Sequence, residues 1–132
     1  MFIIMRHRKK RTILLESGVK KKEIVIRNLL TSLVQHGQII TTAHRAKVLK
    51  ATADAFFSGL LRKYRTAASE QDALRENIRT VKATILWEET GKKVIRDLLP
   101  VYKDAKQQSF VANYKLGFRP GDASMKVLVK LL

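Results

Sequence analysis

The segment Arg6–Arg11 reads Arg-His-Arg-Lys-Lys-Arg, a run of charges that cannot be buried in a hydrophobic core. Adjacent cations repel one another, so such a run lies in solvent or against a polyanion. The 132-residue chain has a formal net charge of +16, yet 45% of its residues are hydrophobic. That content is enough for one folded domain. The excess charge indicates an anionic partner, and nucleic acid fits better than a membrane surface because the run lacks interleaved bulky apolar residues.

The sequence contains no cysteine, which excludes disulfides and thiolate metal sites and fits a reducing compartment. No apolar run approaches the roughly 20 residues of a membrane-spanning helix. Met1–Ile4 precedes the basic run, whereas a secretory signal places its charge before a longer apolar region. We interpret these four residues as a short extension, with Met5 as an alternative start, and expect a cytoplasmic protein that does not enter a membrane.

Two segments organise the chain: a basic arm over residues 1–18, which ends at Ser17-Gly18, and a domain over 19–132. Within the domain, apolar spacing predicts a helix from Val19 to Gln35 that stops at Gly37. A short β-branched strand follows, and the next helix has Leu49, Ala53, Phe56, Leu60 and Tyr64 on its inner face. The expected ranges are 38–42 for the strand and 42–63 for the second helix, with Thr42 at its N-cap.

Ser69 and Asp72 have the spacing of a capping box and open a third helix, whose expected inner face is Leu74, Ile78, Val81 and Ile85. A short fourth helix is predicted over 92–99 and stopped by Pro100. Two strands over 109–116 and 124–131 follow, with Pro120-Gly121 at the centre of a type II turn. The sequence therefore predicts a single α+β domain of order α-β-α-α-α-β-β, with helices packed on a small mixed sheet.

Cations occupy the first turns of the first two long helices, where the helix dipole makes each of them unfavourable by about 0.3–1 kcal/mol. A bound phosphate would reverse that sign, because the free N–H groups and the cations would share one anion. The alternative is that these side chains bend into solvent and are screened. The residues concerned are Lys20, Lys21, Lys22, His44, Arg45 and Lys47, with Thr41 and Thr42 as hydroxyl donors.

No pattern in the sequence is typical of catalysis. His7, His36 and His44 are not at metal-ligating spacing, and the chain has no phosphate-cradling glycine loop and no nucleophile–base pattern. We therefore predict that the protein is not an enzyme and uses no metal, cofactor or small-molecule substrate. Among the aromatic residues, Phe56, Phe57, Tyr64 and Trp87 are expected in the core, and Tyr102 and Phe110 nearer the basic surface.

Several motifs together resemble the bacterial large-subunit ribosomal protein seventeen family. Each is weak alone, but their order and spacing match the family over most of the chain. They are Met5–Lys10, Arg27–Leu33, His36–Thr42 followed by Ala46-Lys47, Tyr102–Asp104, Lys115–Gly117 and Arg119–Ala123. The chain departs from the family pattern at residues 14–17 and 108–112, so contacts there are not carried over.

This resemblance implies a structural protein of the large ribosomal subunit that binds rRNA near the tunnel exit, with ribosomal proteins as neighbours. We expect the arm to thread between RNA segments and the domain to contact phosphates with little base readout. The expected RNA-binding residues are Arg6, His7, Arg8, Lys9, Lys10, Arg11, Lys20, Lys21, Lys22, Arg27, Thr41, Thr42, His44, Arg45, Lys47, Lys115 and Arg119.

A helix-turn-helix DNA-binding regulator is the alternative. The segment Leu33–Lys50 contains a helix, Gly37 and a second helix with Arg45 and Lys47, which is the outline of that motif. Two features weigh against it: residues 38–42 are predicted to form a strand instead of a short turn, and nothing indicates a dimer.

Overall fold

The computed structural model describes residues 22–105 and 109–132. The expected arm over 1–18, its boundary with the domain, and Lys20 and Lys21 lie outside the described residues. The elements are α1 (Lys22–His36), β1 (Gln38–Thr42), α2 (Ala43–Thr66), α3 (Glu70–Thr84), α4 (Glu88–Lys93), the π-helical segment η2 (Val94–Leu98), α5 (Leu99–Ala105), β2 (Val111–Phe118) and β3 (Met125–Leu131). Because α4, η2 and α5 are continuous, the predicted order α-β-α-α-α-β-β and the α+β class are confirmed.

The helix that contains Pro100 is longer than the predicted range of 92–99, because the proline does not end it. Pro100 has no N–H to donate to the carbonyl four residues back. The preceding segment widens into a π-helical turn, in which the N–H of Leu99 bonds to the carbonyl oxygen of Val94. The chain then continues as α5 to Ala105.

The sheet has three strands in the order β1-β3-β2, and both pairs are antiparallel, so the expectation of a mixed sheet was wrong. The short connection between β2 and β3 allows only an antiparallel pair. Within β2 the register shifts between Lys115 and Gly117. Gly117 has a φ of +119° at this bulge, a conformation that glycine adopts without strain.

The loop between β2 and β3 differs from the type II turn predicted at Pro120-Gly121. The carbonyl oxygen of Arg119 accepts from the N–H of Ala123 at 3.0 Å, and the N–H of Arg119 donates to the carbonyl of Ser124 at 2.8 Å. The positive φ of 56° belongs to Ala123, not to Gly121. The chain therefore makes a wider α-type turn, which accommodates more residues than a two-residue turn.

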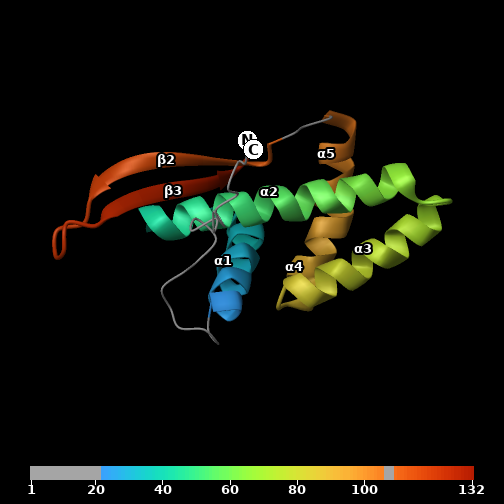
Figure 1. Cartoon of the computed structure of the whole chain (residues 1–132), viewed down its shortest axis with the longest axis horizontal. Coiled ribbons are helices and arrows are strands. Elements are labelled where there is room, and N and C mark those ends of the chain that lie inside the picture. The colour runs from blue at the N-terminus through green and yellow to red at the C-terminus, as the bar shows by residue number, and fades with distance from the viewer. Residues whose placement is uncertain (1–21, 106–108) are drawn as a thin grey trace, which may run out of the picture.

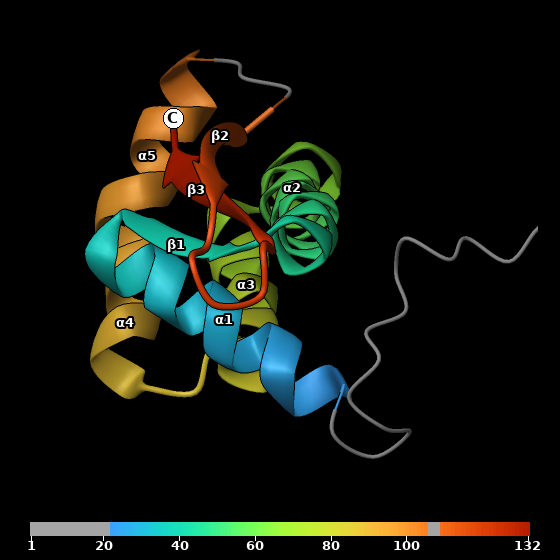
Figure 2. The ribbon, with the colours of Figure 1, turned by 90° about the vertical axis from the view of Figure 1, so that its left-hand side faces the viewer.

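Helix α2 lies along the long axis of the molecule and is the centre of the core (Figure 1). Figure 2, turned by 90°, looks nearly along α2 and shows the sheet beside it. One face of the sheet packs inward, since Val127 and Val129 of β3 are buried. The predicted inner residues of α2 are confirmed, with Tyr64 half-buried. Their buried partners include Leu30, Leu33, Val34, Val94, Leu99, Tyr102, Phe110 and Val111.

The aromatic residues are distributed differently from the sequence expectation. Tyr102 and Phe110, expected near the basic surface, are each 1% exposed and pack on Phe57 with ring centroids 5.2 and 5.6 Å away. Trp87, expected in the core, is 53% exposed. It is the N-cap residue of α4 and lies in extended backbone, so the helical periodicity that placed it inside does not apply.

Helix α3 is rotated relative to the prediction. Val81 is buried as expected, but Leu74 and Ile78 are 38% and 37% exposed, while Ala73 and Asn77 face the core. Ala73, Asn77 and Val81 are spaced four residues apart, so they form one buried side of the helix and leave Leu74 and Ile78 at its edge. The predicted start is confirmed, because the Oγ of Ser69 accepts from the N–H of Asp72 at 3.3 Å.

Candidate nucleic-acid interface

The first turn of α2 exposes positive charge without a compensating acid. Thr42 is the N-cap, as predicted, but its side chain makes no capping hydrogen bond, and the first turn contains no acidic residue. Arg45 and Lys47 are exposed, and neither makes an ion pair within the part of the chain that the structure describes. Arg45 and Lys47 are therefore available to an anion at the positive end of the helix dipole.

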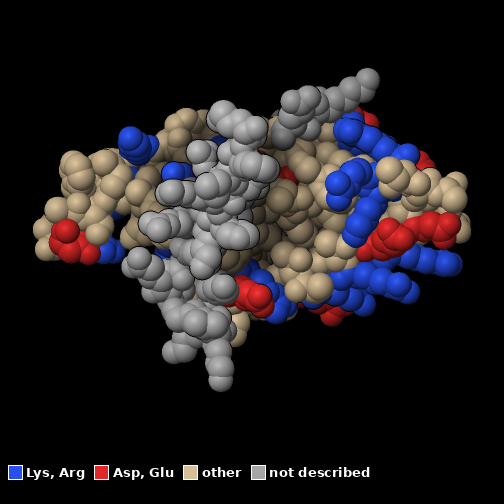
Figure 3. All heavy atoms as spheres, in the orientation of Figure 1, with Lys and Arg blue, Asp and Glu red and all other residues tan. Residues whose placement is uncertain are grey.

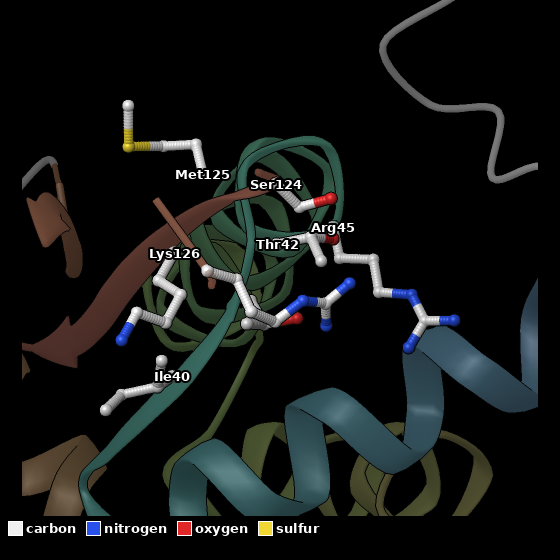
Figure 4. A pocket seen from close by; sticks show the side chains of 8 residues that line it. Ile40, Thr42, Arg45, Ser124, Met125 and Lys126 are labelled. Atoms are coloured by element: carbon white, nitrogen blue, oxygen red, sulfur yellow. The ribbon is translucent and has the colours of Figure 1, made fainter. Parts of the chain in front are cut away.

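The hairpin of β2 and β3 brings further polar groups to the same place. In the sheet register, Thr42 of β1 pairs with Lys126 of β3, so the start of α2 lies next to the start of β3. A hollow of about 360 Å³ lies there, and Figure 4 shows Arg45 and Lys126 on opposite sides of it. We call it the basic hollow; its lining residues are Ile40, Thr41, Thr42, Arg45, Arg119, Ser124, Met125 and Lys126.

Arg119, predicted as an RNA contact, is already held by an acid of its own loop. Its Nε donates to Oδ1 of Asp122 at 2.8 Å, and its Nη2 pairs with Oδ2. The hydrogen bond from Arg119, with a smaller effect from the backbone N–H of Ser124, holds the pKa of the Asp122 carboxyl well below its usual range. The pair remains ionised at neutral pH. Arg119 can therefore still donate hydrogen bonds to a ligand from Nη1 in a fixed orientation. Because Asp122 neutralises part of its charge, Arg119 attracts an anion less strongly than Arg45 does.

Lys115 lies on a neighbouring surface. Its strand neighbour Asn113 donates from Nδ2 to the carbonyl oxygen of Ala46 in the first turn of α2, at 3.2 Å. Residues two apart in a strand share a face, so Lys115 projects from the side of the sheet that faces α2. Lys115 is exposed and does not line the basic hollow.

Arg27 has a different position from the other predicted residues. Its Nε donates to the carbonyl oxygen of Thr84 at 3.2 Å, at the end of α3, and it is half-buried. A cation there is favourable, because the last carbonyls of a helix carry partial negative charge. This contact joins α1 to α3, and Arg27 does not line the basic hollow.

The structure brings together Thr41, Thr42, Arg45 and Arg119, and it adds two polar residues that sequence reasoning missed, Ser124 and Lys126. Strand alternation is the local signal, since it puts Lys126 on the opposite face from its buried neighbour Val127. Only the register with β1 shows that Lys126 lies beside Thr42. His44 and Lys47 are exposed in the first turns of α2, outside the lining. Lys22 is the first residue of α1; the remaining predicted residues, at positions 6–11, 20 and 21, lie outside the described residues.

Within residues 22–105 and 109–132, no group of three or more His, Cys, Asp or Glu side chains is arranged to hold a metal ion. No helix in those ranges has the length and apolar content to cross a membrane. The helix-turn-helix alternative does not fit the fold, because residues 38–42 form an edge strand of the sheet where that motif needs a short turn.

Comparison with known proteins gives one consistent result. The family model described as ribosomal protein L17 matches residues 25–132. Large ribosomal subunit protein bL17 of Carboxydothermus hydrogenoformans is 35% identical over 84% of this chain and 89% of its own length. The bL17 proteins of Thermotoga neapolitana and Dictyoglomus thermophilum are 32% and 34% identical, each over 97% of this chain and over 95% and 100% of their own lengths.

These matches define a structural, non-enzymatic protein of the large ribosomal subunit. The chain belongs to the ribosomal protein L17 family. The resemblance inferred from the sequence motifs is thereby confirmed, and with it the prediction that the protein is not an enzyme.

Proposed function

We propose that this protein binds and neutralises large-subunit rRNA near the tunnel exit of the bacterial cytoplasmic ribosome, in contact with neighbouring ribosomal proteins. Family membership supports the large subunit as its place of action. The formal charge of +16 supports a polyanion as the main partner. No described residue supports a catalytic role.

The basic hollow is the observation that carries the proposal. Arg45 and Lys126 line it from α2 and β3, and neither is neutralised by an acid within the described residues. The hydroxyls of Thr41, Thr42 and Ser124 add neutral hydrogen-bonding groups. Cations and hydroxyls beside the positive end of a helix dipole match phosphate and sugar oxygens, which fix register on RNA without reading its sequence.

The segment before α1 adds a second RNA contact to this proposal. The arm of residues 1–18, with Arg6–Arg11 as its basic run, binds between RNA segments and neutralises their phosphates. Replacement of Arg6, Arg8, Lys9, Lys10 and Arg11 with Ala should weaken RNA binding and leave the thermal midpoint nearly unchanged. A large fall in that midpoint would instead show that the arm stabilises the folded domain.

A binding assay tests whether the basic hollow contacts RNA. It measures the affinity of the purified protein for transcribed large-subunit rRNA over a range of salt concentrations. Arg45→Ala should lower affinity about tenfold, the value of one charged hydrogen bond. It should also reduce the slope of log affinity against log salt by roughly 0.7–0.9, the share of one phosphate contact. Lys126→Ala should act in the same way.

Arg65→Ala is the matched control, since Arg65 is exposed in the last turn of the same helix. We expect it to change affinity less than twofold. Equal losses for Arg45→Ala and Arg65→Ala would mean that general charge, not the hollow, binds RNA. Preference for one duplex DNA sequence over folded rRNA would contradict the proposal altogether.

The position near the tunnel exit can be tested in assembled subunits. The chain has no cysteine, so Ser124→Cys at the hollow would carry a single tethered iron chelate that cleaves nearby RNA. Ser58→Cys, on the exposed side of α2, is the control. Cleavage from Ser124→Cys should map to rRNA around the exit and exceed that from Ser58→Cys. Cleavage confined to other regions of the subunit would refute this position.

A further inference from the structure

A second hollow, of about 570 Å³, lies between α3 and the continuous helix of α4 and η2. Three large apolar side chains are exposed along it: Ile78, Leu86 and Trp87 are 37%, 40% and 53% exposed. Large exposed apolar patches with polar rims mark interaction sites in soluble proteins. We call it the Trp87 groove; its apolar lining is Ile78, Val81, Ile85, Leu86, Trp87 and Ile95.

The groove is fixed by contacts beneath it. Gly91 of α4 lies so close to α3 that a Cβ there would be 3.0 Å from Cγ1 of Val81. The backbone N–H of Leu86 donates to Oγ1 of the buried Thr31 at 3.2 Å. These contacts hold the connection that carries Leu86 and Trp87 against the helices, so the groove is formed before any partner binds.

The rim of the groove is positively charged. Lys82 and Arg96 line it and make no ion pair within the described ranges, whereas Lys92 is 3.3 Å from Glu88. The acid on the rim, Glu88, is therefore paired with a cation, whereas Lys82 and Arg96 have no acidic partner within the described residues. At the other end of α3, where α2 gives way to it, basic and acidic side chains are intermixed (Figure 3). An occupant with acidic residues beside its apolar anchors would complement this rim.

We propose that the Trp87 groove binds a segment of a neighbouring protein that inserts large apolar side chains and carries acidic residues on either side of them. RNA is disfavoured at the floor, because a sugar or base edge among Ile78, Ile85 and Leu86 would lose hydrogen bonds to water without replacement. The single tryptophan has the large surface typical of residues that dominate protein interfaces. This surface is separate from the basic hollow, so the inference goes beyond RNA binding.

Site-specific cross-linking in large subunits tests the proposal. Ile78→Cys and Leu74→Cys differ by one turn of α3 and have nearly equal exposure, but only Ile78 lines the groove. Each variant would carry a benzophenone label and be assembled into subunits. We expect Ile78→Cys to cross-link to a protein segment rich in apolar and acidic residues, at least fivefold more than Leu74→Cys. Cross-links mainly to rRNA, to a basic segment, or in equal yield from both positions would overturn the inference.

A measurement in solution tests the Trp87 groove independently of ribosome assembly. If labelled protein fails to enter subunits, that result counts against the proposed function alone, and the groove is still tested. Trp87 is the only tryptophan, so its fluorescence reports the groove directly. The probe is a synthetic amphipathic peptide with Leu and Phe on one face and Glu on the other. It should shift the emission to the blue and bind at least tenfold tighter than the same peptide with Lys for Glu. Ile78→Glu should abolish the shift, and Leu74→Glu should preserve it. No shift, or equal binding of both peptides, would overturn the inference.

Discussion

Asp54 of α2 accepts a hydrogen bond at Oδ1 from the backbone N–H of Phe110, with 2.9 Å between the atoms. Its Oδ2 lies 2.9 Å from Nζ of Lys50 on the same helix. One half-buried carboxylate therefore attaches the residue before β2 to the middle of α2. Phe110 is itself buried against Tyr102 and Phe57, so this contact fixes both the aromatic cluster and the beginning of the hairpin that carries Lys126.

Replacement of Asp54 by Ala should lower the free energy of unfolding by about 1–3 kcal/mol, because a buried backbone donor loses its acceptor. Urea denaturation of both proteins measures the difference. Asp104→Ala, at an exposed acid of α5, is the control and should change stability by less than about 0.5 kcal/mol. Equal effects at both positions would show that the Phe110 contact is not stabilising.

Tyr102 should make the free energy of unfolding depend on pH in alkaline solution. Burial raises the pKa of its hydroxyl above the ordinary value, and the hydroxyl has no hydrogen-bond partner within the described residues. Above about pH 10 the unfolded chain releases this proton more readily than the folded chain, so the free energy of unfolding falls as pH rises. Tyr102→Phe should weaken that dependence in urea denaturation at pH 7 to 11. A loss of more than about 1 kcal/mol at pH 7 would show instead that the hydroxyl is bonded.

The carboxyl of Asp122 should titrate at unusually low pH. Its pKa is lowered chiefly by the hydrogen bond from Arg119, so any stabilisation from the pair is complete above the ordinary Asp pKa of about 3.9. That stabilisation is lost only as pH falls through the lower, folded value. The carbon chemical shift of this carboxyl, followed by NMR, measures the midpoint. In Arg119→Gln the midpoint should move up toward the ordinary value; an unchanged midpoint would exclude Arg119 as the cause.

Asp122→Asn should strengthen RNA binding. The amide keeps an oxygen that can accept from the N–H of Ser124, but it removes the charge that neutralises Arg119. The freed guanidinium faces the basic hollow, so the slope of log affinity against log salt should become steeper by roughly 0.7–0.9. Binding to large-subunit rRNA over a salt series measures it. The same substitution is then made in the Arg119→Ala background. There, Asp122→Asn should leave the slope unchanged, because the guanidinium that it frees is gone. A gain in affinity that persists without Arg119 would contradict this explanation.

Replacement by Ala should have opposite effects on stability at two helical glycines, Gly59 and Gly91. A Cβ at Gly59 of α2 would meet nothing within 4 Å, so Gly59→Ala should stabilise the protein by about 0.5–1 kcal/mol through helix propensity. At Gly91 the added Cβ would press on Val81, so Gly91→Ala should be less stable than Gly59→Ala by at least about 1 kcal/mol. Thermal unfolding compares the two variants directly. Equal gains would mean that α4 moves away from α3 without penalty.

Local signals explain why the order of elements could be predicted. Gly37 has a φ of +79° immediately after α1, and Ser69 caps α3, both as the sequence indicated. The apolar spacing of α2 also gave its inner face correctly. These features depend on residues within one or two turns of each other, and their physics does not require the rest of the molecule.

The candidate site was predicted only in part. Thr41, Thr42 and Arg45 are adjacent in sequence, and the helix start that they share is a local feature. Lys126 was missed because its position beside Thr42 follows from pairing between strands far apart in the chain. Arg119 was predicted, but its bond to Asp122 depends on the loop geometry that replaced the expected type II turn.

The sequence by itself determined the basic charge, the succession of helices and strands, and the family, because composition, periodicity and motif order are properties of the chain. Only the tertiary structure decided which side of α3 faces the core, where Trp87 lies, and that α2 and the hairpin share one hollow. Each of these depends on long-range packing: the rotation of a helix and the register of a strand are set by the elements that they contact, and no local pattern records them.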